Sequence, residues 1–508
     1  MKKFFAAIAV LMMTSANTFA GGILTNTNQS VSFLRNPARD AAIGLDGVYS
    51  NPAGVAFMPE GFHIAFNWQY AHQTRTTTWQ NDLLKLGKKN NGQDTKEYEG
   101  VANAPFIPSV QAAYNKGKWS YQFNFAVSGG GGKCEFEQGI GSFETVVGAI
   151  ANKLIGISNM LNNNLAPLGA SVPNVTGYDV DGYMKGRQYY FGIQLGAAYK
   201  LNEHLSVYGG LKVLYGTASY EARLNNIRVM NGEQGITLPQ YFNGVENGLY
   251  TGIQRALAAG RTQDAQQLQA VGEQLNASAE TLAPYANGMN LKSDQSGWGV
   301  SPVIGVDYKT GPFNFAAKYE FKTRMRMKNN SDLLEATVID AMNKYVDGTS
   351  VPEDSPALLT LGAQWSVRPD IRLNLGYHHF YDTYAHWYNN SQKLLDGGTN
   401  EYLAGVEWDI TDQLTVSAGG QLTRYQLTDE YMNDMSFVVN SYSFGCGLSY
   451  KVKENITLSA AYFQTNYTNY DMATPEQKME SLGLTIPAGS NSFTRTNRVL
   501  GIGCELSF

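Results

Sequence analysis

The residues best suited to acid–base chemistry lie in one segment near the C-terminal third of the chain. His378 falls on the same predicted inner face as Arg372, Asn374 and Asp382. A hydrolase of the Ser–His type would need a serine held beside this imidazole. No pattern marks Ser366 or any other serine for that role. We therefore expect no enzyme and no catalytic residue, with His378 a polar residue of the interior.

A run of glycines, Gly129, Gly130, Gly131 and Gly132, precedes Lys133. This run lacks the eight-residue Gly/Lys/Ser spacing of a phosphate-binding loop. The three cysteines cannot all pair, and no two stand at the spacing of metal ligands. We expect no metal and no cofactor. Glycines remove side chains, so the run could bend or interrupt a strand, or simply lead into a flexible loop.

Cations gather on one predicted face of residues 313–328. Even-numbered positions there place Lys318, Lys322 and Arg324 beside the single acid Glu320. Such a wall would favour a carboxylate head group through charge-assisted hydrogen bonds. Alternatively, these charges hold water and pair with acids elsewhere. The predicted ligand-binding residues are Lys212, Lys318, Lys322, Arg324, Arg372 and His378.

The composition excludes several classes of protein. Only 16% of the 508 residues are charged, against about 25% in average globular domains, yet the mean hydropathy of −0.28 is too polar for a bundle of membrane helices. The aromatic content of 12% argues against disorder. A net charge of −5 offers no basic surface for nucleic acid.

The first twenty residues have the pattern of an export signal. Lys2 and Lys3 precede an apolar stretch from Phe4 to Met13, and Ala20 ends a small-residue cleavage site. The apolar stretch is about half the length that a membrane-spanning helix needs. We expect residues 1–20 to be a signal peptide.

Beyond residue 62, apolar residues repeatedly alternate with small or polar ones, as in Trp119–Val127 and Tyr189–Tyr199. Period two places one set of side chains on each face of a strand. A soluble sandwich would also alternate, but many of these segments exceed the usual 5–6 residues, and their apolar faces often begin and end with Tyr or Trp. The predicted strands are 62–79, 105–115, 118–128, 188–200, 204–224, 297–309, 313–328, 357–367, 371–386, 400–409, 413–428, 437–451, 455–468 and 493–508.

Fourteen strands with alternating short and long connections predict an all-β, 14-stranded antiparallel transmembrane β-barrel. The opposite face of these strands suits a polar lumen. Helical periodicity marks residues 143–165 and 249–282 in long extracellular loops, and a short stretch, 332–345. These helices either cap the barrel and bury their apolar stripes on each other, or line an apolar groove that faces outward.

Residues 21–61 do not alternate and could fold into the barrel as a plug. They contain the run Val48-Tyr49-Ser50-Asn51-Pro52-Ala53-Gly54. This run resembles the hatch motif of the FadL family of outer-membrane transporters for long-chain fatty acids and other hydrophobic compounds. Asn36-Pro37-Ala38 also spells the three central letters, but it lacks the flanking residues. The predicted hatch residues are Asn51, Pro52, Ala53 and Gly54.

The resemblance implies a monomeric barrel, with residues 62–508 forming the wall and 21–61 an N-terminal hatch that plugs the lumen. It also implies passive transport across the outer membrane of a Gram-negative bacterium. Ligand would be captured in an extracellular apolar groove and released through a lateral opening where the third strand kinks, here at Gly129–Gly132. Expected partners are a hydrophobic small molecule, outer-membrane lipid and lipopolysaccharide, but not nucleic acid. The alternative is a general diffusion porin or a surface-binding barrel.

Overall fold

The computed structural model describes residues 23–283, 286, 288–333, 344–435, 437–480 and 482–508. The predicted signal peptide and most of the predicted helix 332–345 lie outside these residues.

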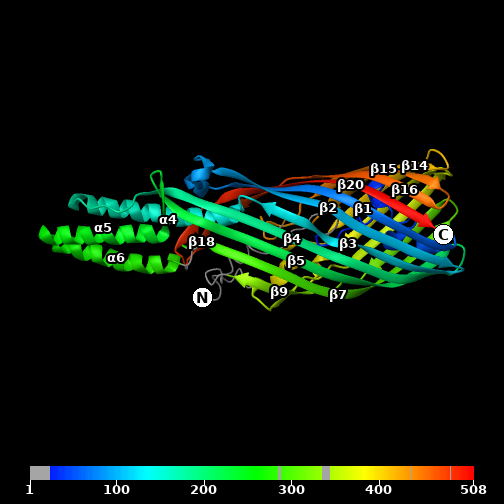
Figure 1. Cartoon of the computed structure of the whole chain (residues 1–508), viewed down its shortest axis with the longest axis horizontal. Helices are drawn as coiled ribbons and strands as arrows, with labels where there is room; N and C mark the ends of the chain where they lie inside the picture. Colours follow the sequence, from blue (N-terminus) through cyan, green and yellow to red (C-terminus); the bar gives the residue numbers. More distant parts are fainter. Residues whose placement is uncertain (1–22, 284–285, 287, 334–343, 436, 481) are drawn as a thin grey trace.

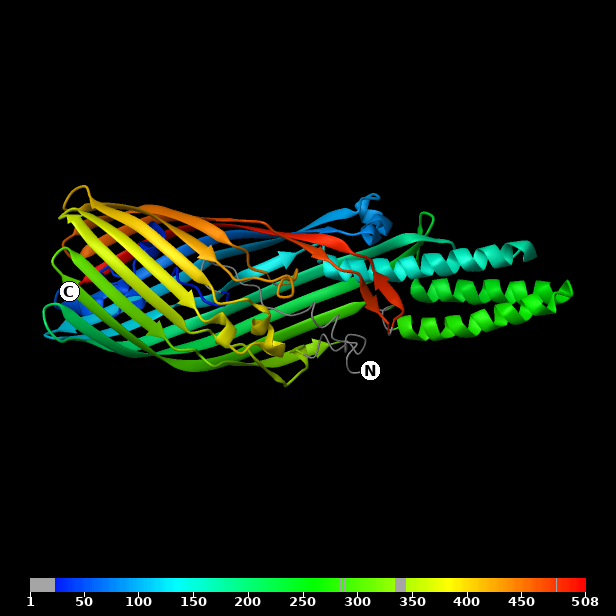
Figure 2. The ribbon, with the colours of Figure 1, turned by 180° about the vertical axis from the view of Figure 1, so that it is seen from behind.

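The wall is a closed antiparallel barrel of fourteen strands, as predicted (Figures 1 and 2). The first and last strands close it, with Phe66 opposite Cys504 in their ladder. The strands are β1 (Gly61–Gln80), β2 (Thr95–Lys116), β3 (Trp119–Phe136), β4 (Val175–Lys200), β5 (Leu205–Asn231), β7 (Met289–Thr310), β8 (Phe313–Glu320) continued by β9 (Arg326–Leu333), β11 (Leu358–Arg368), β12 (Ile371–Phe380), β13 (Asn400–Asp409), β14 (Leu414–Arg424), β15 (Ser441–Lys453), β16 (Ile456–Tyr467) and β20 (Gly489–Ser507). Short strands complete the loops: β6 (Gln234–Thr237), β10 (Ser350–Pro352), β17 (Tyr470–Thr474), β18 (Gln477–Met479) and β19 (Leu484–Ile486).

The outer face of the barrel carries a band of exposed apolar side chains with aromatic residues at both margins. The aromatic residues at one margin are Tyr215, Trp298, Tyr402 and Tyr442, and those at the other are Trp119, Tyr308, Phe313, Trp365, Trp408 and Tyr450. A closed barrel leaves no unpaired edge, so it can carry such a band through hydrocarbon. This arrangement is that of an outer-membrane β-barrel.

Several strands run well past the apolar band, so parts of the predicted loops 80–104, 129–187 and 225–296 belong to the wall. Part of the inner face of this extension is apolar: Tyr98, Phe136, Tyr178, Tyr220 and Met327 are all buried in one cluster. The prediction of a polar lumen is therefore wrong around this cluster, whereas Arg75 and Arg495 are polar residues at the inner face of the same half. In the cluster the inner side chains form a dry core because α4 (Gly141–Leu165) inserts its first turns between them.

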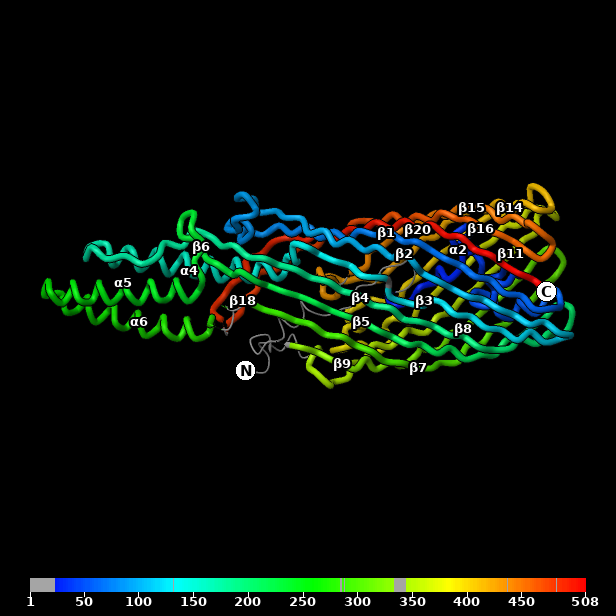
Figure 3. Tube along the Cα trace, in the orientation of Figure 1, coloured from blue at the N-terminus to red at the C-terminus, as the bar shows by residue number. Residues whose placement is uncertain are grey.

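Three helices project beyond the extracellular end of the barrel (Figures 1 and 3). The segment predicted as helix 249–282 is two helices, α5 (Leu238–Ala258) and α6 (Thr262–Leu282), because Gly260 turns the chain at a φ of +73°. Their apolar stripes pack against those of α4 and one another. The stripes are thus buried mutually, but the helices extend away from the barrel instead of capping it. None of the described helices combines the length and apolar character needed to span a membrane.

The N-terminal segment, residues 23–60, lies in the lumen of the barrel (Figure 3). It contains α2 (Val31–Arg35), α3 (Gly47–Ser50) and the short 3-10 helix η1 (Gly54–Phe57). Helices this short are not stable alone, and the wall fixes them from several sides. The backbone N–H of Val31 donates to Asn67 on β1, and Asn314 on β8 donates to the carbonyl of Ala41.

The predicted strand 313–328 is interrupted between Glu320 and Arg326. Lys318 and Glu320 face inward, but beyond the break the buried residues are Met325 and Met327. The two-residue period therefore shifts phase by one position across the break. Arg324 is exposed on the outer face, and its predicted inward orientation is wrong.

Candidate functional site

The hydrogen-bonded ladder of the wall is interrupted between β2 and β3. Asn103 pairs with Lys133 and Ser109 pairs with Ala126, but residues 104–108 and 127–132 between them have no partners across this ladder. At about 3.3 Å per residue, the interruption spans on the order of 17 Å along the strands. Pro105 lies within it and has no N–H to donate.

The glycine run lies at this interruption. Opposite β4, the third strand contains two irregularities, one between Val127 and Gly129 and one between Gly130 and Gly132. Gly130 and Gly132 have φ values of +70° and +83°, a region that L residues with side chains seldom occupy. The predicted opening at Gly129, Gly130, Gly131 and Gly132 therefore coincides with a bend and a missing ladder. Passage of a ligand here stays a prediction.

From inside the barrel, the start of the N-terminal segment covers the interruption. The backbone N–H of Asn26 donates to the carbonyl of Ser128 at 2.9 Å, and its side-chain Nδ2 donates to that of Gly130 at 2.9 Å. A Cβ atom on Gly129 would lie 2.2 Å from the carbonyl oxygen of Leu24. The backbone of Gly129 therefore packs directly against the backbone of the N-terminal segment, with no room for a side chain between them.

Apolar side chains of the wall at the interruption pack against helix α2 of the N-terminal segment. Val31 and Leu34 of α2 share a buried cluster with Ile107 of β2 and Val127 of β3. A hydrophobic molecule at the interruption would therefore meet apolar side chains of both the wall and the N-terminal segment.

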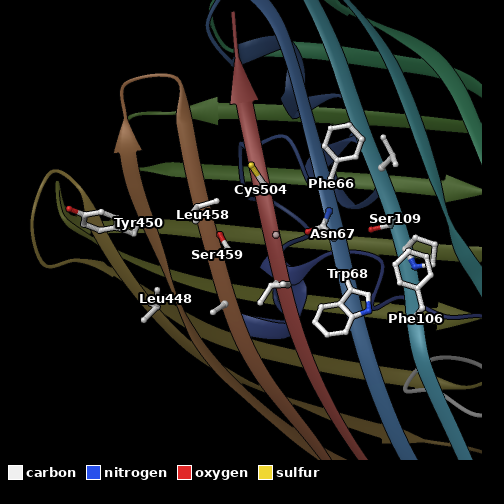
Figure 4. A pocket seen from close by; sticks show the side chains of 15 residues that line it. Phe66, Asn67, Trp68, Phe106, Ser109, Leu448, Tyr450, Leu458, Ser459 and Cys504 are labelled. Carbon is white, nitrogen blue, oxygen red and sulfur yellow. The ribbon is translucent and has the colours of Figure 1, made fainter.

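On the outer face, an apolar groove of about 710 Å³ crosses five strands from β2 to β15 (Figure 4). Phe106 and Pro108 from the interrupted stretch of β2 line one end of it. Trp68 projects into the groove and donates its indole N–H to the carbonyl of Pro105 at 2.9 Å. The stretch of β2 with no partner on β3 thus contributes to a lipid-facing hydrophobic surface.

The predicted hatch residues are buried and bonded to the wall. Nδ2 of Asn51 donates to the Asp307 carboxylate at 2.6 Å, while its Oδ1 accepts from the backbone of Gly54 at 3.1 Å. The carbonyl of Pro52 accepts from Gln122, and that of Ala53 from the hydroxyl of Ser206.

Buried ion pairs fix the middle of the N-terminal segment. Arg39 donates to Glu407 at 2.7 Å and to Asp46 at 2.8 Å, and a second arginine, Arg35, lies 3.7 Å from Glu407. His378 bridges Asp40 of the segment, at 3.0 Å, to a wall acid, Glu401, at 2.7 Å.

Most of the cations predicted to bind ligand already have partners. Lys212 and Lys318 both pair with Glu320, at 2.6 and 2.8 Å. Lys322 donates to the carbonyl of Tyr384, and Arg372 forms a two-pronged ion pair with Asp409. These contacts correspond to the alternative in which the charges pair within the barrel. A role for them in binding ligand stays a prediction.

Sequence reasoning missed the contribution of β2 to the interruption. The signal was available: Pro105 and Pro108 fall inside a strand pattern, where proline marks an edge or a bulge. The covering role of Leu24 and Asn26 had no such signal, because residues outside the strands show no period from which a position can be read.

Above the barrel, a buried acid gives the extracellular loops a pH dependence. Asp434 accepts from the backbone N–H of Ser142 in the first turn of α4 at 2.8 Å. Burial raises the pKa of Asp434 to about 6, although this hydrogen bond acts in the opposite direction. A raised pKa means that the folded state binds the proton more tightly. Docking of the α4 N-terminus should therefore strengthen as pH falls from about 6 to about 4, by about 2–3 kcal/mol.

Hydrogen exchange of the first turns of α4, corrected for the intrinsic pH effect, checks this expectation. Protection should rise at pH 5 relative to pH 7.5 in the wild type and lose this dependence in Asp434→Asn. The control is Glu430→Gln, an exposed acid of the same loop. An equal pH response in wild type and Asp434→Asn would contradict the assignment.

Comparison of the sequence with protein-family models and with curated proteins gives no match. Solved structures match over almost the whole chain. A FadL homologue of Pseudomonas aeruginosa covers 96% of this chain and 100% of its own, with a TM-score of 0.62 and 11% identity. The toluene transporter TbuX of Ralstonia pickettii covers 94% and 98%, with a TM-score of 0.51 and 12% identity. The monoaromatic hydrocarbon channel CymD covers 95% and 99%, with a TM-score of 0.50 and 13% identity. This chain therefore has the fold of the FadL family of outer-membrane transporters, which its hatch-like motif had predicted.

Proposed function

We propose that this protein carries long-chain fatty acids or similar hydrophobic molecules passively across the outer membrane and releases them sideways through its wall. The observation that carries the proposal is the interruption of the ladder between β2 and β3, which has an apolar cluster on its inner side and an apolar groove on its outer side. A water-filled pore offers an apolar solute no favourable path, whereas such a side exit lets the solute stay among apolar groups.

The extracellular half supplies the first part of the path. Its inner face carries buried aromatic and aliphatic side chains, including Tyr98, Phe136 and Met327. An apolar molecule that enters here leaves water at a gain of about 25 cal/mol per Å² of apolar surface. It then meets the N-terminal segment, which blocks the straight route to the periplasm.

Release requires only the start of that segment to move. Asn26 is held across the interruption by its bonds to Ser128 and Gly130, each worth about 0.5–1.5 kcal/mol, and Leu24 by burial in an apolar cluster, worth about 1.5–3 kcal/mol. Residues 35–46 are held by buried ion pairs and are therefore much harder to displace. The opening with the lowest free-energy cost is thus a shift of Leu24–Asn26 away from Gly129, with the rest of the hatch in place.

A general diffusion porin is the competing function, and conductance separates the two. In planar bilayers the wild-type protein should show no steady ion current, because residues 23–60 fill the lumen. In proteoliposomes the same preparation should speed the transfer of hexadecanoate or naphthalene. A steady current, or no acceleration for either compound, would contradict the proposal. The heat-modified mobility of the folded barrel in gels controls for assembly.

A further inference from the structure

Two buried arginines face the lumen where β1 and β20 close the barrel. Arg75 and Arg495 are direct cross-strand partners in the antiparallel ladder, and their exposed fractions are 1% and 3%. The inward neighbours Gln73, Thr77 and Asn497 are equally buried. These five residues are called the arginine strip below.

Among the described residues, Arg75, Thr77 and Asn497 of the strip carry donor groups without hydrogen-bond partners, and the strip also holds one acceptor without a partner, Oε1 of Gln73. Within the described part of the chain, neither Nε nor Nη2 of Arg75 has a hydrogen-bond partner, and no carboxylate pairs with this guanidinium. The hydroxyl of Thr77 and Nδ2 of Asn497 are also without partners there. Nε2 of Gln73 donates to Oδ1 of Asn497 at 3.2 Å, so this oxygen already accepts one hydrogen bond. The free groups nearest Arg75 are therefore mostly donors.

This arrangement is electrostatically unfavourable by itself. Like charges directly opposite each other in a ladder repel, and arginine cannot lose its proton in a protein. Elsewhere the same barrel pairs its buried cations, as with Lys318 and Glu320 or Arg39 and Glu407. Arg75 departs from that rule, so its charge requires a partner from outside the described fold.

Aromatic side chains surround the two guanidinium groups. The ring of Phe437 lies 5.8 Å from Cζ of Arg75, and that of Tyr467 lies 5.0 Å from Cζ of Arg495. Phe437 also packs against Phe493 at 5.1 Å. These rings belong to an apolar cluster that includes Leu24, the residue whose carbonyl lies against Gly129. The strip therefore adjoins apolar surface that leads to the interruption in the wall.

We propose that the arginine strip binds the carboxylate of an amphipathic ligand, whose apolar part packs on the cluster around Phe437 and Phe493. A carboxylate accepts hydrogen bonds only and matches the planar fork of arginine, so it would satisfy Arg75, Thr77 and Asn497 together. The inference rests on the proposed function and narrows the substrate class to hydrophobic molecules with one compact anionic group.

Equilibrium binding to the purified full-length barrel tests the strip. Radiolabelled hexadecanoate is displaced by unlabelled acid, by its methyl ester or by hexadecan-1-ol at pH 8. The wild type should prefer the acid about tenfold or more, as expected for a lost charged hydrogen bond. Arg75→Gln should lose this preference while still binding the ester, and Arg75→Lys should fall between. Arg498→Gln, exposed on the outer face of the same strand, should match the wild type.

Thermal unfolding without ligand gives a second readout. Removing an uncompensated buried charge should leave the Arg75→Gln barrel as heat-resistant as the wild type or more so, whereas a purely structural arginine would leave it less so. If Arg75→Gln keeps the wild-type ratio of affinities for the acid and the ester, the arginine strip does not bind the carboxylate. A wild type that binds acid, ester and alcohol equally also overturns carboxylate binding by the strip, while hydrophobe binding and the proposed function stand. A wild type that binds none of the three overturns both.

Discussion

Replacing Glu407 with alanine is expected to turn a closed barrel into one that conducts ions. Glu407 is buried and receives Arg39 at 2.7 Å, with Arg35 and Arg372 each 3.7 Å away. Without Glu407, Arg39 keeps Asp46 and Arg372 keeps Asp409, but Arg35 has no carboxylate left among the described residues. Leaving such a buried charge uncompensated costs about 3–5 kcal/mol. Arg35, at the end of α2, and Arg39 both belong to the N-terminal segment. This cost therefore weakens the attachment of the hatch to the wall. The wall keeps its closed ladder of hydrogen bonds and should stay assembled.

Single-channel recording in planar bilayers measures the effect, and limited proteolysis of residues 23–60 provides an independent check. The matched control is Asp370→Asn, which breaks an exposed ion pair with Arg368 on a periplasmic turn and should cost no more than about 1 kcal/mol. If Glu407→Ala shows no ion current and its hatch resists protease as well as the wild-type hatch does, the ion pairs do not hold the hatch in place.

The sequence predicts the barrel because a lipid-facing strand imposes a strict period of two. Each outward position must be apolar, so in a segment such as Tyr189–Tyr199 the lipid-facing and lumen-facing residues can be assigned from that segment alone. The same rule fails at the break between Glu320 and Arg326, where irregular backbone resets the phase. It also fails above the membrane, where the inner faces of β4 and β5 also carry apolar residues, which pack in one core with α4.

The lumen is less predictable because its contacts join residues far apart in sequence. Nothing local indicates that Glu320 also pairs with Lys212, or that His378 reaches Asp40. Arg75 illustrates the limit most clearly. Its odd-numbered place on the inner face could be read from the alternation, but its partner Arg495 depends on how the first and last strands register when the barrel closes.

A disulfide across the interruption is expected to abolish delivery of ligand without affecting its capture. The Cβ of Ala104 lies 3.4 Å from the position that a Cβ on Gly132 would take, close to the 3.5–4.5 Å between the Cβ atoms of a disulfide. The pair Ala104→Cys and Gly132→Cys should therefore bridge β2 and β3 where their ladder is missing. A side chain on Gly132, at a φ of +83°, adds about 1–2 kcal/mol of strain, which a stable barrel tolerates.

The three native cysteines are first replaced by serine, since Cys134 lies only two positions from Gly132. The control bridge joins Ala112 and Phe123, which face each other where the β2–β3 ladder is intact. This bridge adds the same chemistry to the same two strands but should leave the exit free.

The most direct test of lateral release is uptake of radiolabelled hexadecanoate and of naphthalene by cells that carry the bridged barrel, measured beside surface binding. Under oxidising conditions the 104–132 bridge should retain binding, lower delivery at least tenfold, and recover after reduction, whereas the 112–123 bridge should deliver normally throughout. Delivery at the wild-type rate through the oxidised 104–132 bridge would contradict an exit between β2 and β3.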